Sequence, residues 1–159
     1  MKNSNLHLFL VISLLLLLIS SNCEREEKHP IPDVYVHFII NLQTDPEFFI
    51  LRSQGASAII TSTDIGVFNL GYDNNGIIVY NAGDGEFYAF DRTCPYDIPE
   101  SIAVETEDAL SAFATCPRCG SVYVFPSLGV STIDSPSKWP LKKYNAIYNP
   151  NTGDLRVSN

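Results

Sequence analysis

The sequence is poor in positive charge. Of its 159 residues, 10 are Lys or Arg and 18 are Asp or Glu, so the formal net charge is −8 at pH 7. A nucleic-acid-binding protein needs a cationic surface to neutralise phosphates. The charge balance therefore argues against nucleic acid as a partner, and a protein or a small molecule is the more plausible partner.

Histidine and recognisable catalytic motifs are also scarce. The chain has three histidines, and it shows no Ser/His/Asp set, no phosphate-binding loop and no pair of catalytic carboxylates. His29 lies in a charged segment and His37 in an expected strand, so we interpret both as surface or core residues and not as metal ligands. We therefore do not expect an enzyme.

Long apolar runs are absent except at the N-terminus. Lys2 precedes an apolar run from Leu6 to Ile19, which is shorter than the roughly 20 residues that a membrane-spanning helix needs. This pattern predicts a signal peptide over residues 1–22. The small and polar residues 20–22 lead into Cys23, and this junction resembles a bacterial lipoprotein signal.

The resemblance to a lipoprotein signal implies that the mature chain starts at a lipidated Cys23. The protein would then be anchored by lipid in a membrane of the bacterial cell envelope, on its periplasmic or surface side. The alternative is a plain secretory signal that leaves Cys23 as a free or paired thiol. Residues 23–32 are charged and end in prolines, so we predict a solvated tether there and one domain over residues 33–159.

The predicted domain consists of short runs rich in β-branched and aromatic residues, separated by turn residues. This pattern indicates an all-β fold, an antiparallel sandwich or small barrel. Two hairpins are expected, each across a turn rich in Gly, Asn and Asp. The expected strands are residues 34–40, 48–51, 58–61 and 67–70, the hairpin of 76–80 with 87–90, and the hairpin of 144–148 with 155–157.

The remaining three cysteines form two groups. Cys94 stands alone, and after 21 intervening residues comes Cys116-Pro-Arg-Cys119-Gly. A Cys-x-x-Cys turn can present two sulfurs to one metal ion, and a cysteine from a second loop adds a third ligand. On spacing alone, a redox disulfide within the Cys-x-x-Cys turn remains equally possible.

The cysteine loops resemble those of a Rieske domain, in which Cys-x-His and Cys-x-x-His-Gly loops hold a [2Fe–2S] cluster. Cys94, Cys116 and Gly120 match that pattern, and Ser121 and Tyr123 stand where the family places hydroxyls that bond to cluster sulfurs. The resemblance implies a Rieske-like antiparallel β-sandwich with a small cysteine-bearing subdomain and metal-binding loops at about residues 91–138. It also implies electron transfer with a redox partner protein.

The two histidine positions of the Rieske pattern hold Tyr96 and Cys119, which leaves three possibilities. A [2Fe–2S] cluster could bind Cys94 and Cys116 on one iron, and Cys119 with Tyr96 or Asp97 on the other. Zn²⁺ could bind the three thiolates, with Tyr96, Asp97 or water as fourth ligand. Without metal, Cys116 could form a disulfide with Cys94 or with Cys119.

We therefore predict a Rieske-like iron–sulfur or metal-binding lipoprotein that transfers electrons at the cell envelope. The alternative is a degenerate Rieske fold with zinc or a disulfide, acting as a structural or binding module without redox activity. The first 23 residues contain no twin-arginine pair, which counts against a cluster inserted before export.

Overall fold

All strand pairings in the described part of the chain are antiparallel. The structure is a computed structural model, and it describes residues 28–96 and 98–159. The strands are β1 (His37–Asn41), β2 (Ser57–Ile60), β3 (Ile77–Gly83), β4 (Glu86–Asp91), β5 (Phe113–Thr115), β6 (Val122–Val124), β7 (Val130–Ser131), β8 (Lys143–Asn149) and β9 (Asp154–Ser158). Short 3₁₀ helices are η1 (Pro46–Arg52), η2 (Tyr72–Asn74), η3 (Ile98–Glu100) and η4 (Phe125–Ser127).

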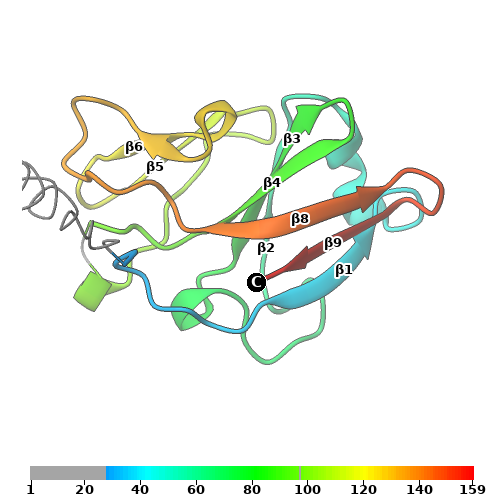
Figure 1. The fold of residues 1–159 in the computed structure, drawn as a ribbon, viewed down its shortest axis with the longest axis horizontal. Coiled ribbons are helices and arrows are strands. Elements are labelled where there is room, and N and C mark those ends of the chain that lie inside the picture. Colours follow the sequence, from blue (N-terminus) through cyan, green and yellow to red (C-terminus); the bar gives the residue numbers. More distant parts are fainter. Residues whose placement is uncertain (1–27, 97) are drawn as a thin grey trace, which may run out of the picture.

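The strands form two sheets of unequal size. The large sheet has the order β1-β9-β8-β4-β3-β2, and the small sheet has the order β5-β6-β7. Strand β8 pairs with β4 through Lys143 and Tyr144 and then with β9 through residues 145–149, so it connects the two halves of the large sheet. The small sheet lies at one end of the molecule (Figure 1). The predicted antiparallel sandwich with a small cysteine-bearing subdomain is confirmed.

Strand β3 is buried on both faces, which explains the continuous apolar run over its residues 77–80. Ile77 and Val79 belong to a first core between the halves of the large sheet, whereas Ile78 and Tyr80 face a second core beneath the small sheet. The second core also contains two of the cysteines. The core that contains these cysteines therefore packs against a strand that both cores hold in place.

The predicted hairpins 76–80/87–90 and 144–148/155–157 are both present, as β3–β4 and β8–β9. Two other expected strands are wrong. Residues 48–51 lie in η1, where Phe48 and Leu51 are both buried, and a spacing of three suits a 3₁₀ turn and not an alternating strand. Residues 67–70 form no strand, and the Phe68 side chain there is fully exposed.

Residues 28–36, which we call the N-terminal strap, pack against the domain. The Ile31 side chain is 1% exposed, and the Lys142 ammonium donates to the Ile31 carbonyl oxygen (3.1 Å) and to the Asp33 carboxylate (2.6 Å). His29 Nε2 lies 3.0 Å from the Pro140 carbonyl oxygen. From His29 onward, the segment expected to be a solvated tether is thus part of the folded unit.

The predicted signal peptide, residues 1–22, and Cys23 lie outside the described residues. Within residues 28–96 and 98–159, none of the helices has both the length and the apolar character needed to cross a bilayer.

Candidate metal centre

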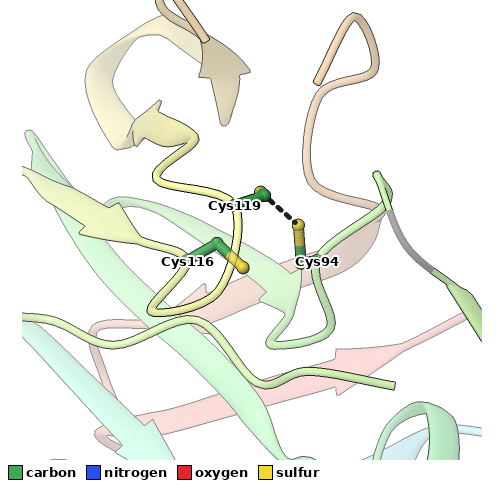
Figure 2. A group of neighbouring side chains, drawn as sticks. All are labelled: Cys94, Cys116 and Cys119. Atoms are coloured by element: carbon green, nitrogen blue, oxygen red, sulfur yellow. Dashed lines mark hydrogen bonds between the residues drawn. The ribbon is translucent and has the colours of Figure 1, made fainter. Parts of the chain in front are cut away.

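The structure brings Cys94, Cys116 and Cys119 together at the edge of the second core (Figure 2). Cys94 follows β4, and the other two lie in the turn between β5 and β6. Their three Sγ atoms all lie within 4.8 Å of one another, and Cys94 Sγ is 3.7 Å from Cys119 Sγ. The three cysteines that the sequence singled out therefore form one cluster.

The segment Ile102–Glu105 holds the two cysteine loops at a fixed separation. The Cys94 backbone N–H donates to the Ile102 carbonyl oxygen (2.8 Å), and Glu105 exchanges two backbone hydrogen bonds with Thr115 at the end of β5. Val104, between these contacts, is fully buried in the second core. One buried segment thus pairs with both loops and sets the distance between them.

The turn over residues 116–121 aims two sulfurs toward Cys94. The Cys116 N–H donates to the Ser121 carbonyl oxygen and the Gly120 N–H donates to the Cys116 carbonyl oxygen, both at 2.9 Å. Gly120 has φ +73°, a conformation that side chains other than hydrogen disfavour. This requirement gives a physical reason for the glycine that follows the second cysteine.

Two hydroxyl groups contact the cysteine sulfurs. The Tyr123 hydroxyl lies 3.1 Å from Cys94 Sγ, and the Ser121 hydroxyl lies 3.1 Å from Cys119 Sγ. The Ser137 N–H donates to the Ser121 oxygen (3.0 Å) and so ties the loop after β7 to the site. Sequence reasoning missed Ser137, although it lies within residues 91–138, where the Rieske resemblance implies the metal-binding loops.

The environments of the sulfurs differ. Cys94 is 0% exposed and Cys116 is 2% exposed, whereas Cys119 is partly exposed. Burial raises the pKa of the Cys94 thiol to about 12, although the Tyr123 hydroxyl and the Tyr96 backbone N–H act in the opposite direction. Burial also acts to raise the pKa of Cys119, but hydrogen bonds from Ser121 and the neighbouring thiols outweigh it, and the net pKa is lowered. Cys119 is therefore the easier of these two thiols to ionise.

Asp91 anchors the start of the Cys94 loop, and sequence reasoning missed it. Its carboxylate is 0% exposed and accepts hydrogen bonds from the Thr93 N–H (2.9 Å), the Tyr72 N–H (2.8 Å) and the Tyr144 hydroxyl (2.9 Å). Burial, and then the nearby Asp91 charge, raises the pKa of Tyr144. The one sequence signal for this role is an Asp at the end of an expected strand, because an Asp side chain can accept a hydrogen bond from the backbone N–H two residues later.

Tyr96 stays only a predicted ligand. Its side chain is 56% exposed and lines a surface groove with Pro30 and Trp139. Asp97 lies outside the described residues. Among the His, Cys, Asp and Glu side chains of the described residues, the metal-compatible cluster consists of the three cysteines, and no histidine joins it.

The three sulfurs fit a single tetrahedral ion. A Zn–S bond of about 2.3 Å implies an S···S edge of about 3.8 Å in a tetrahedral site. The distance of 3.7 Å between the Sγ atoms of Cys94 and Cys119 matches this edge. Because all three Sγ atoms lie within 4.8 Å of one another, the other two S···S distances exceed the edge by at most about 1 Å. Thiolates on the two irons of a [2Fe–2S] cluster would be separated by the cluster itself, so this compact triangle suits a shared ion better.

The fold and the site define a small all-β domain with a three-cysteine candidate metal centre. No protein-family model matches the chain, and no curated protein matches it. Among solved structures, it is similar to a crystal structure described as a "putative NADH-dependent nitrite reductase small subunit from Mycobacterium tuberculosis". The two chains share 16% sequence identity with a TM-score of 0.43, over 80% of this chain and 97% of the other.

Proposed function

We propose that this protein is a metal-binding module in which Cys94, Cys116 and Cys119 bind one ion, with Zn²⁺ as the best match. The observation that carries the proposal is the triangle of three sulfurs within 4.8 Å. Zinc favours sulfur-rich tetrahedral sites and needs no cluster assembly. The ion would join the loops after β4 and between β5 and β6, and its fourth ligand would be Tyr96, Asp97 or water.

The surrounding groups support thiolate ligands. Metal binding requires deprotonated cysteines. The Tyr123 hydroxyl can donate a hydrogen bond to Cys94 Sγ, and the Ser121 hydroxyl, which accepts from the Cys119 thiol in the metal-free protein, lies 3.1 Å from that sulfur. Hydrogen bonds to a ligand atom orient it and disperse its charge. Binding should release protons, one of them from Cys94, whose pKa burial raises to about 12.

A second candidate is an electron carrier with a [2Fe–2S] cluster that serves a redox partner protein. The Tyr123 and Ser121 hydroxyls support it, because they lie beside the cysteine sulfurs at the positions where the Rieske resemblance implies hydroxyls that bond to cluster sulfurs. In that case Cys119 would have to move away from the other two sulfurs to reach the second iron.

We further propose that the protein acts at the bacterial cell envelope as a lipoprotein anchored through Cys23. The apolar run and the small residues before Cys23 support this location. Replacing Cys23 by Ala should move the protein from the membrane fraction to the soluble fraction. Unchanged membrane association of this variant would contradict the lipid anchor.

Metal analysis of the purified protein tests the two candidates. Protein purified under reducing conditions from a host with intact cluster assembly should be colourless and contain about one zinc per chain. Brown protein with about two irons and two acid-labile sulfides per chain would establish the second candidate instead. Protein that takes up neither iron nor zinc would refute both.

The Cys116→Ser variant should lose metal binding, because it leaves only two of the three clustered cysteine ligands. Thr115→Ser is the matched control, since Thr115 is the exposed neighbour of Cys116 and its side chain is outside the cluster. Equal metal content in both variants would exclude this site.

A further inference from the structure

The three sulfurs differ in their access to solvent. Cys94 and Cys116 are buried, whereas Cys119 is partly exposed at the tip of the turn between β5 and β6. A thiol can react with an external disulfide only if that disulfide reaches its sulfur. An oxidant that approaches the site therefore meets Cys119 first.

The sulfur that can react next with Cys119 belongs to Cys94, in the other loop (Figure 2). The two Sγ atoms are 3.7 Å apart, so a disulfide of about 2.05 Å requires them to approach by less than 2 Å. A Cys94–Cys119 disulfide also closes a far longer loop than a Cys116–Cys119 disulfide would. Closing a longer loop restricts the unfolded chain more, so a Cys94–Cys119 disulfide stabilises the folded protein more.

We propose that, in the metal-free protein, Cys119 and Cys94 form a thiol–disulfide exchange pair that reacts with small-molecule disulfides. Cys119 is the attacking thiol and Cys94 is the resolving thiol. The proposal rests on the proposed function in one respect: the disulfide consumes two of the three metal ligands. Oxidation and metal binding then exclude each other, and the site changes between a metal-bound form and a cross-linked form.

The exchange is balanced with glutathione disulfide as the oxidant. The Cys119 thiolate attacks one sulfur of glutathione disulfide, whose S–S bond breaks and releases one glutathione thiolate. The Cys94 sulfur then attacks the Cys119 sulfur of the mixed disulfide, and its proton passes to the departing glutathione. Two protein thiols are oxidised to one disulfide, and one glutathione disulfide is reduced to two glutathione molecules.

Peptide mapping tests this pairing directly. Reduced, metal-free protein is incubated with glutathione disulfide, trapped with N-ethylmaleimide and digested with trypsin and a glutamate-specific protease. Trypsin cleaves after Arg118 and so separates Cys116 from Cys119. Cleavage after the glutamates at 100, 105 and 107 separates Cys94 from Cys116. Each of the three pairings then gives a different cross-linked mass.

We expect a Cys94–Cys119 linkage with Cys116 alkylated. In the Cys94→Ser variant, glutathione should remain attached to Cys119, because the resolving thiol is missing. The Cys116→Ser variant should lose metal binding and still form the Cys94–Cys119 disulfide. A disulfide that contains Cys116, or no disulfide in the metal-free protein, would overturn the inference.

Metal content measured in parallel separates this inference from the proposed function. If the reduced protein binds no metal, the metal proposal fails, and the peptide map still decides the pairing. If the reduced protein binds metal and the Cys94–Cys119 linked protein retains it, the proposed exclusion fails while the metal site stands.

Discussion

Replacing Asp91 by Asn should destabilise the protein far more than an ordinary surface substitution. The buried carboxylate accepts three hydrogen bonds, and each bond to a charged acceptor contributes about 1.5–3 kcal/mol. Asn keeps one oxygen for the Thr93 N–H, but it presents an amide NH₂ to the Tyr72 N–H, which then has no acceptor. We expect a loss of about 3–5 kcal/mol in the free energy of unfolding.

Tyr144→Phe provides the comparison, because it removes one of the three donors and keeps the ring. It should cost about 1–2 kcal/mol, since the Tyr72 N–H still satisfies the same carboxylate oxygen. The double variant should lose less than the sum of the two single losses, because both changes remove the same Asp91–Tyr144 contact.

Urea unfolding followed by the fluorescence of Trp139, the one tryptophan in the chain, measures these differences. Reductant and chelator should be present throughout, so that metal binding does not add to the stability. If Asp91→Asn costs less than about 1 kcal/mol, or no more than Tyr144→Phe, Asp91 is not the anchor of the Cys94 loop.

Three further predictions concern other parts of the fold. Ile31→Ala should lower the free energy of unfolding by about 2–5 kcal/mol in the same assay, because the Ile31 side chain is 1% exposed. Ile39→Ala, at a half-exposed position, should lower it by less than about 1 kcal/mol. Equal losses would show that the strap is not part of the core. Gly129→Ala should lower the free energy of unfolding by about 1–3 kcal/mol more than Gly66→Ala. Both glycines have φ near +70°, but a Cβ at position 129 would lie 3.0 Å from the Phe90 ring, whereas a Cβ at position 66 would have no atom within 4 Å. Similar losses would refute the close packing at Gly129. The hydrogen bond from Lys142, and then the Lys142 charge, lowers the pKa of Asp33. This contact therefore stabilises the fold at pH values above the ordinary pKa of a carboxyl group, and the stabilisation is lost as the pH falls through the lowered pKa. Asp33→Asn should therefore lower the urea midpoint at about pH 7 more than at about pH 2, and a pH-independent effect would argue against the ion pair.

The strands that the sequence predicted correctly are those with strong local signals. The hairpins β3–β4 and β8–β9 have turn residues suited to positive φ, such as Asp84 (φ 51°) and Gly153 (φ 80°), between apolar runs. Local signals misled at residues 48–51, where apolar content suggests a strand but the buried positions are three apart. The short strands β5 and β7 are held by contacts with β6 and not by their own sequence, so no local pattern could define their bounds.

The cysteine cluster was predictable because the ligand type and the spacing are both encoded locally. The groups that position it were not, because their contacts join distant parts of the chain. Asp91 meets Tyr144 across 53 residues, and Ser121 meets Ser137 across 16. Ile31 shows the same limit, because nothing in a charged, proline-containing segment indicates that one isoleucine reaches the core.

The docked strap limits how far the domain can extend from its proposed lipid anchor. Only residues 24–28 separate Cys23 from His29, and an extended chain spans at most about 3.5 Å per residue, which gives a reach of about 20 Å. That is shorter than the roughly 30 Å diameter of a domain of this size. Pro30 of the strap shares a groove with Pro95 and Tyr96, the residues that follow Cys94. With Cys23 lipidated, the cysteine loops would thus be held beside the lipid headgroups, and a molecule that exchanges metal or electrons with them would have to approach along the membrane plane.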